Sequence, residues 1–458
     1  MEKVPIDPLL IKKYNRPVPR YTSYPTVPFW NDEIDQPGWG NAFANRFDTE
    51  NHLNGISLYI HLPFCESLCT YCGCNKKITT NHNVEDEYLV AVEKEWKLYR
   101  KLMNQTPVVR EIHLGGGTPT FFSPANLQRL LTIILKTSIV HPAASFSIEG
   151  HPNNTTKEHL KSLYTIGFRR ISYGVQDNDP EVQKIINRIQ PLQKVEEATN
   201  NARDAGFTSV NFDLIYGLPL QTEESIERTF HQIIPFKPDR IAFYSYAHVP
   251  WTSKSQRLFD ENHLPNAEEK LGLYLKGKEL LLAHGYTNIG MDHFALPHDE
   301  LYKAWKNGVL YRNFMGYTTQ NTGLLLGLGV SAISDIGYAF AQNGKTLHDY
   351  YQGVHSENLP VKKGYYLTPE DQDFRKSILD ISCKGFTEIN TAHLPLLKEI
   401  SFPVLDELVE DGLVEYTDHY VKLTSQGHYF IRNVCSAFDL KLRRSHSVLQ
   451  TQIFSNAV

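Results

Sequence analysis

The chain has 458 residues, a length that predicts two to three ordinary domains or one large α/β barrel with additions. Its net charge of −5, with 21% charged residues, gives no broad basic field for nucleic acid. Residues 1–10 carry acidic residues and prolines where a signal peptide needs an apolar run, and no segment approaches the ~20 apolar residues of a membrane span. We therefore expect a cytoplasmic protein whose partners are neither nucleic acid nor a membrane.

Residues 1–50 are rich in proline and tyrosine and show little periodicity, which predicts an irregular N-terminal arm. The prolines of segment 16–25 favour an extended backbone, and the segment is too aromatic for a flexible linker. Changes in character after residues 50 and 363 predict three parts, which are an arm (1–50), a main domain (51–363) and a helical C-terminal domain (364–458).

From residue 56 onward, short apolar runs alternate with longer amphipathic segments. The predicted strands are 57–61, 111–114, 145–149, 170–173, 210–215, 240–246 and 288–291, and the predicted helices include 85–102, 124–135, 191–205 and 267–284. Alternation of this length argues for right-handed βαβ units in a mostly parallel sheet. Six or seven such units predict an α/β fold, an incomplete (β/α) barrel.

Polar residues stand where these strands end. They are His61, Glu149, Gln176, Asp213 and His248, each at or just past the carboxyl end of a predicted strand. In (β/α) barrels this end of the strands forms the active face. We expect a ligand site there.

After the glycine-rich segment 313–334, the C-terminal part has a different pattern. Helices are predicted over 368–382 and 403–411, and two short strands over 412–424 with a turn near Asp418. This order resembles a winged-helix unit. Because the acidic balance argues against DNA binding, we expect a lid or packing role.

Four of the six cysteines lie within ten residues, at positions 65, 69, 72 and 74, whereas Cys383 and Cys435 stand alone. A disulfide framework would spread its cysteines through a small secreted domain. Crowding in a large cytosolic chain indicates metal or redox chemistry instead.

The spacing of three and then two residues lets Cys65, Cys69 and Cys72 bind three irons of a four-iron, four-sulfur cube from one loop. The fourth iron would then be open to a chelating ligand. The alternative is a structural zinc site, but zinc normally takes two separated pairs of ligands. Cys74 could in principle complete a four-thiolate site, although one intervening residue makes joint ligation by Cys72 and Cys74 awkward. We expect the first three cysteines to be the metal ligands.

The cysteine spacing, with the aromatic Tyr71 before the last ligand, resembles the signature of the radical S-adenosylmethionine (SAM) superfamily. More widely, the chain resembles the oxygen-independent coproporphyrinogen III oxidase family of haem biosynthesis. The segments that carry the resemblance are 19–25, 59–61, the cysteine cluster with its Gly73-Cys74-Asn75-Lys76 tail, 115–119, 213–219, 290–295, 316–320 and 427–433. The cysteine motif is specific only for the superfamily, while segment 19–25 and Gly73-Cys74-Asn75 are specific for this branch.

This resemblance implies an oxidoreductase with a [4Fe–4S] cluster and SAM as cofactors, and with a second SAM beside the first. The implied reaction is the oxidative decarboxylation of two propionates of coproporphyrinogen III to vinyl groups, giving protoporphyrinogen IX in anaerobic haem biosynthesis. The implied partners are a tetracarboxylate porphyrinogen and a small electron-transfer protein of flavodoxin or ferredoxin type, and the family suggests a monomer.

The resemblance also implies cofactor contacts. Glycines make the tight turn of segment 115–119 possible without strain, and Gly116, Gly117 and Thr118 are implied to approach the methionine part of SAM. Glu149 is implied to hold a ribose hydroxyl, although a carboxylate there could simply cap a helix. The further implied contacts are Tyr71, Gln176, Arg188 and Asp213, among which the planar fork of Arg188 suits a carboxylate.

Tyr59 and His61 lie two apart on one predicted strand and so share a face. By residue type alone, His61 could be an ordinary buried histidine. With the resemblance, Tyr59, His61 and Cys74 are implied as catalytic, and Tyr59 also as a cofactor contact.

The second SAM is implied to lie against Ala247, Phe314, Met315 and Ile333, which would otherwise be assigned to the core. Two departures from the family pattern are Met315, where a glutamine is expected, and Gly150-His151, which replaces a Val-Asp pair.

The substrate carboxylates need cations, and Arg16, Arg20 and Arg312 are our candidates. The alternative functions are a haem-binding chaperone and a radical haem-degrading methyltransferase on the same scaffold. Chaperone relatives lack the equivalents of Cys74 and of segment 20–25, both of which are present here.

Overall fold

The computed structural model describes residues 7–445 and 454–457. Its centre is a twelve-stranded sheet in the order β16-β15-β14-β13-β1-β4-β5-β6-β7-β8-β10-β9. Six consecutive parallel strands form the middle, which are β1 (Ile56–Leu62), β4 (Val108–Gly116), β5 (Ile139–Gly150), β6 (Phe168–Gln176), β7 (Ser209–Tyr216) and β8 (Arg240–Ser245). The two edge strands, β16 and β9, pair with neighbours in the sheet but not with each other. The predicted incomplete barrel is confirmed.

Antiparallel strands extend the sheet at both ends. β13 (Leu325–Leu328) pairs in parallel with β1, and β14 (Ile333–Asp335), β15 (Ala339–Asn343) and β16 (Val361–Tyr366) follow it antiparallel. At the other end, β10 (His293–Ala295) runs antiparallel to β8, and β9 (Thr287–Gly290) pairs with β10. The last predicted strand, 288–291, is therefore an antiparallel edge rather than a seventh parallel unit.

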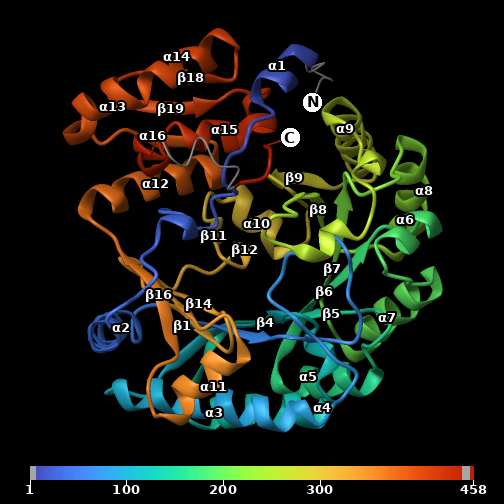
Figure 1. Cartoon of the computed structure of the whole chain (residues 1–458), viewed down its shortest axis with the longest axis vertical. Coiled ribbons are helices and arrows are strands. Elements are labelled where there is room, and N and C mark those ends of the chain that lie inside the picture. The colour runs from blue at the N-terminus through green and yellow to red at the C-terminus, as the bar shows by residue number, and fades with distance from the viewer. Residues whose placement is uncertain (1–6, 446–453, 458) are drawn as a thin grey trace.

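Helices cover the outer side of the sheet (Figure 1). They include α3 (Val84–Leu102), α4 (Pro124–Lys136), α5 (Lys157–Ile166), α7 (Leu192–Ala205), α8 (Glu223–Ile233) and α9 (Ala267–Ala283). Successive side chains of a strand point to opposite faces. In β4, the apolar side chains Ile112 and Leu114 are fully buried in the main core with the helices, while the polar side chains Glu111 and His113 line an interior cavity. The interior of this barrel is consequently polar.

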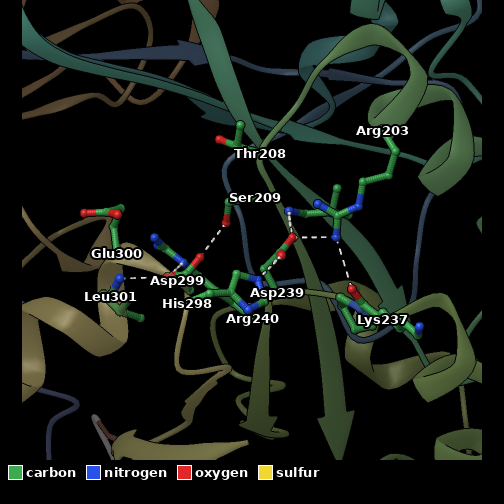
Figure 2. Close-up of polar contacts among 12 residues, drawn as sticks. Arg203, Thr208, Ser209, Lys237, Asp239, Arg240, His298, Asp299, Glu300 and Leu301 are labelled. Carbon is green, nitrogen blue, oxygen red and sulfur yellow. Dashed lines mark hydrogen bonds and ion pairs between the residues drawn. The ribbon is translucent and has the colours of Figure 1, made fainter.

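Two carboxylates, Asp239 and Asp299, join a network of polar contacts at the starts of β7 and β8 (Figure 2). Asp299 accepts hydrogen bonds from Ser209 Oγ (2.8 Å) and Arg240 Nε (2.6 Å), which belong to the first residues of β7 and β8. Asp239 pairs with Arg203 (2.6 Å) and His298 (2.7 Å). These contacts fix the amino ends of β7 and β8, and residues nearer the carboxyl ends of these strands line the main cavity.

The N-terminal arm is not irregular throughout, so that prediction is wrong for two helices, α1 (Pro8–Tyr14) and α2 (Gln36–Glu50). Asp35 caps α2 by accepting from Gly38 N, and Pro37 occupies its first turn, a pairing of cap and proline typical of helix starts. The helix buries Trp39, Phe43 and Phe47. Asp35 followed by Pro37 is a helix-start signal in the sequence, and it could have identified α2.

The C-terminal part contains the predicted two helices and hairpin. They are α12 (Pro369–Lys384), α14 (Phe402–Glu410), β18 (Val414–Tyr416) and β19 (Tyr420–Leu423), with α13 (Leu394–Ile400), β17 (Phe386–Glu388) and α15 (Ile431–Ser436) in addition. Its core includes Tyr14, Tyr21 and Tyr24 of the arm. The aromatic arm could close over a ligand or serve only as a structural strap that holds the fold together. The burial of these three tyrosines supports the structural strap.

No helix within residues 7–445 or 454–457 is long and apolar enough to cross a membrane.

Arg375 joins the C-terminal part to the sheet. This residue of α12 pairs with Asp335 at 2.5 Å, with both side chains at most 10% exposed, and donates to Gly337 O at 2.7 Å. We expect Arg375→Leu to cost about 3–5 kcal/mol, because it leaves the buried Asp335 carboxylate unpaired. The measurement is the thermal unfolding midpoint.

The matched control is Lys376→Leu, which removes the exposed pair with Asp380 on the same helix and should cost only about 0.3–0.5 kcal/mol. Equal losses for the two variants would contradict the role assigned to Arg375.

Candidate active site

A cavity of about 790 Å³ opens where the parallel strands end, between the cysteine loop, the glycine turn after β4 and the ends of β5, β6 and β7. Most predicted site residues line it, namely Cys65, Cys69, Tyr71, Cys72, Cys74, Gly116, Gly117, Thr118, Glu149, Gln176, Arg188 and Asp213. Of the five polar strand ends in the sequence, Glu149, Gln176 and Asp213 thus share one cavity. His61 and His248 are not among its lining residues, and His248 instead contacts the Tyr246 hydroxyl (3.1 Å) and Glu261 (3.0 Å).

The cysteine loop is closed at its base by a short parallel pair, β2 (Phe64–Cys65) and β3 (Lys77–Ile78). Inside the loop, Thr118 Oγ1 donates to Cys65 Sγ at 3.3 Å, and Arg188 Nη1 lies 3.6 Å from Cys69 Sγ. A hydrogen bond from Cys74, with the charge of Lys76, lowers the pKa of Cys72 to about 6. The environment of Cys72 therefore favours the thiolate, the form that binds metal.

The donor set fits an iron–sulfur cluster better than a zinc ion. All six cysteines are free thiols, and four of them line one cavity, among them Cys65, Cys69 and Cys72 with the predicted spacing. In the described part of the chain, no three Cys, His, Asp or Glu side chains form a ready-made site for a single ion. A zinc ion needs its ligands about 2.0–2.3 Å from one point, whereas the corners of a four-iron cube are separate.

The glycine turn lies directly against the cysteine loop. A Cβ at Gly117 would lie 2.4 Å from Pro63 O and 3.0 Å from Cys65 Sγ, and Gly116 has a φ of +125°. Only glycine allows this approach, so the turn can bring backbone groups close to the metal ligands.

Behind the loop, a hydrogen-bonded pair connects β1 to the cysteine tail. His61 Nε2 lies 2.9 Å from Asn75 O, and His61 Nδ1 lies 3.0 Å from the Tyr59 hydroxyl. Burial lowers the pKa of His61, so its ring is neutral. Because a carbonyl can only accept, Nε2 carries the proton, and Nδ1 accepts from Tyr59.

Two carboxylates face the cavity. Glu149 accepts from His113 Nε2 (3.2 Å) and Gly116 N (3.3 Å) and does not cap a helix; the cap of the following helix, α5, is Thr156. Asp213 accepts from Ser172 Oγ and Asn211 Nδ2, both at 2.8 Å, and burial raises its pKa to about 6. Both groups can accept hydrogen bonds from the hydroxyl or amino groups of a ligand.

Arg188 and Gln176 complete the wall. Arg188 donates to Gly174 O at 2.5 Å, and its buried Nε has no partner among the described residues. Burying a cation without a carboxylate is costly, and a guanidinium pairs well with a ligand carboxylate. Gln176 has a left-handed backbone (φ +66°), a conformation that often marks functional sites.

The residues predicted for a second SAM are not gathered in one cavity. Phe314 and Ile333 pack against a hydrophobic cluster with Trp30 and Phe340, and Ala247 O accepts from Gln256 at 3.1 Å. Met315 lines an interior cavity of about 130 Å³, which shares Glu149, Ser172, Asp213 and Tyr244 with the main cavity.

Sequence reasoning missed the side chains of that interior cavity, which include Glu111, His113, Arg170, Asn211, Arg240 and Tyr244. They follow the period of two along β4, β6, β7 and β8, so the alternation of polar and apolar residues was the available signal. Tyr244 and His151 also line the main cavity.

The contact at Gly117 gives a prediction. We expect Gly117→Ala to lower the iron bound after anaerobic reconstitution several-fold, because its Cβ would displace Pro63 O or Cys65 Sγ. The measurement is iron and sulfide per chain. The control is Gly73→Ala in the same loop, where a Cβ would meet no atom within 4 Å. A Gly117→Ala protein that binds as much iron as the control would contradict the prediction.

Comparison with known proteins identifies the family of the chain. A family model described as the radical SAM superfamily matches residues 59–233. The oxygen-independent coproporphyrinogen III oxidase of Salmonella typhimurium is 39% identical over 98% of both chains, and that of Synechocystis sp. is 37% identical over 98% of this chain and 97% of the other. The solved structure of coproporphyrinogen III oxidase (HemN) from Escherichia coli, described as a radical SAM enzyme, matches with a TM-score of 0.87 at 37% identity, over 96% of this chain and 100% of that one.

The cofactors of radical SAM enzymes, a [4Fe–4S] cluster and SAM, are therefore those of this chain, and its cavity has the groups to hold both. Identity at this level over nearly the whole length shows that the chain belongs to the oxygen-independent coproporphyrinogen III oxidase family.

Proposed function

We propose that this chain catalyses the radical SAM-dependent oxidative decarboxylation of two propionates of coproporphyrinogen III to vinyl groups, giving protoporphyrinogen IX. The observation that carries the proposal is the cavity in which four cysteine thiols, the carboxylates Glu149 and Asp213 and the buried Arg188 meet at the strand ends. The proposal is also supported by similarity, because the chain is 39% identical, over 98% of both chains, to the oxygen-independent coproporphyrinogen III oxidase of Salmonella typhimurium.

The cluster and SAM, when bound, supply a primary carbon radical that can take a hydrogen atom from the substrate. Cys65, Cys69 and Cys72 would hold three irons, and Arg188 would bind the carboxylate of SAM through its unpartnered Nε–H edge. Glu149 would accept from a ribose hydroxyl, because its carboxylate is 43% exposed toward the cavity.

Tyr59, His61 and Cys74 would orient the site rather than transfer protons. The fixed hydrogen bonds from Tyr59 to His61 and from His61 to Asn75 O leave neither imidazole nitrogen free. The reaction needs no net proton transfer, since each propionate loses one hydrogen atom, carbon dioxide and one electron as the vinyl group forms.

A second SAM remains part of the proposal. Its support is the room beside the first site, where the main cavity and the interior cavity share Glu149, Ser172, Asp213 and Tyr244. Met315 lines the interior cavity and would contact a molecule that reaches into it.

Among the arginine candidates for the substrate carboxylates, Arg312 has the best support. It is 5% exposed, and its Nε has no partner among the described residues. Arg20 donates to Ser245 O, Arg16 lies over the Tyr14 ring (5.5 Å to its centroid), and Arg312 donates to Arg20 O at 3.3 Å, so all three contact or belong to the arm, and the unpartnered Nε is what favours Arg312.

The proposed electron donor is a small protein of flavodoxin or ferredoxin type. The cysteine loop is accessible to such a partner, because Glu66, Gly73 and Cys74 are exposed. We further propose a monomer in the cytoplasm, where thiols stay reduced, which agrees with six free cysteines.

The direct test is an anaerobic assay of the reconstituted protein with a reductant, SAM and coproporphyrinogen III, following protoporphyrin and 5′-deoxyadenosine together. We expect both products to form, and Cys69→Ala to abolish both by removing an iron ligand. The control is Cys383→Ala, which changes a buried cysteine outside the cavity and should retain both products. 5′-Deoxyadenosine without any porphyrin product would contradict the proposed substrate, and haem would then be tested.

Arg312 gives a second prediction. Arg312→Gln should raise the KM for coproporphyrinogen at least tenfold, because a charge-assisted hydrogen bond to a carboxylate is lost, while KM for SAM stays unchanged. The control is Arg257→Gln, an exposed arginine that binds Pro250 O in a surface loop. An unchanged KM for the porphyrinogen in Arg312→Gln would exclude this assignment.

A further inference from the structure

Glu95 is a fully buried carboxylate on α3, outside the cavity. It accepts three hydrogen bonds, from Gly329 N (2.7 Å), Asn343 Nδ2 (2.6 Å) and the Tyr350 hydroxyl (2.7 Å). Burial raises its pKa to about 7, and the three donors oppose that shift. Burying a carboxylate in the middle of a helix is energetically unfavourable, and the hydrogen-bond partners of Glu95 indicate its structural role.

The three hydrogen-bond donors show which segments of the chain Glu95 binds. Gly329 begins the turn between β13 and β14, and the Asn343 amide also donates to Gly329 O at 2.8 Å, so both backbone groups of Gly329 are fixed. This turn is tightly packed, since a Cβ on Gly329 would lie 2.6 Å from His61 O. The glycine-rich segment singled out in the sequence is thus pressed against the end of β1.

Tyr88 joins the same helix to that contact. Its hydroxyl donates to His61 O at 2.6 Å and accepts from Val330 N at 3.0 Å. The side chain is fully buried and lies two turns before Glu95 on the same side of α3. One helix therefore fixes both the strand that carries His61 and the turn beside it.

The network reaches the cysteine loop through Asn75, which directly follows Cys74. His61 Nε2 donates to Asn75 O, and Asn75 Nδ2 donates to Lys345 O at 2.9 Å. Lys345 lies two residues beyond Asn343, the partner of Glu95. Asn75 is thus held on two sides by elements that Glu95 and Tyr88 fix.

We propose that Tyr88 and Glu95 are positioning residues that hold the tail of the cysteine loop in the shape needed to bind the iron–sulfur cluster. The inference rests on the proposed cluster but not on the proposed substrate. Apart from the exposed contact between Asn75 and Lys345, the polar groups of this network are buried and paired. Removing the Tyr88 hydroxyl leaves the buried Val330 N–H without a partner and loosens the contacts that depend on it.

The first test uses the cluster-free protein and amide hydrogen exchange. Tyr88→Phe and Glu95→Gln should speed exchange about tenfold at Gly329 and Val330 and also in residues 74–76. The matched control is Tyr99→Phe, which removes a buried hydroxyl from the same helix that accepts from Trp39 Nε1 at 3.1 Å. It should lower the thermal midpoint similarly and leave residues 74–76 unchanged.

The second test measures the rate at which a chelator removes iron from the reconstituted protein. We expect about tenfold faster loss in Tyr88→Phe and Glu95→Gln, with a changed electron paramagnetic resonance spectrum of the reduced cluster, and wild-type behaviour in Tyr99→Phe. The proposal is overturned if folded Tyr88→Phe protein exchanges faster only at Gly329 and Val330, or if all three variants lose iron at one rate. Neither measurement depends on the porphyrinogen, so a wrong substrate would not affect them.

Discussion

Three thiolates on one loop can bind a cluster only if the loop between them keeps a single shape. Ordering a loop costs conformational entropy, about 1–2 kcal/mol for each residue fixed, and the fold distributes that cost over several contacts. The pairing of β2 with β3 closes the base, the Gly117 turn supports Cys65, and Asn75 is bound from both sides. The chemistry proposed for the cavity depends on this rigidity.

The second constraint is the alternation of side chains along the parallel strands. Apolar residues on one face of β1, β4 and β5 pack against the helices, which leaves the other face free for polar groups. Glu149 and Asp213 occupy the carboxyl ends of that face, and Arg240 its beginning, where it pairs with Asp299 (Figure 2). Stability and ligand binding are thus served by opposite faces of the same strands.

The same alternation explains why much of the fold and the main cavity could be predicted. Strands such as 210–215 are framed by apolar runs and turn signals, and their polar last residues share one edge by topology alone. The antiparallel strand β9 could not be distinguished from a parallel one, because pairing direction depends on the connection that follows. The helix α2 was missed because prolines and aromatic residues obscured its periodicity.

Contacts between residues far apart in the sequence could not be predicted. Tyr88 and Glu95 look like ordinary members of an amphipathic helix until β13 and β15 are placed beside them. The second-SAM residues lie on loops and at the start of β14, whose positions are not fixed by periodicity. Arg188 could be identified by resemblance, but only the structure places its guanidinium beside Cys69 with an unpartnered Nε.

The proposed chemistry requires that three cysteines bind the cluster and leave one iron open to SAM. Mössbauer spectroscopy of the reconstituted protein with and without SAM tests it most directly. We expect a four-iron cluster in which SAM changes the signal of one iron and leaves the other three alike. A spectrum that SAM does not change, or a preparation that takes up zinc in place of iron, would contradict it.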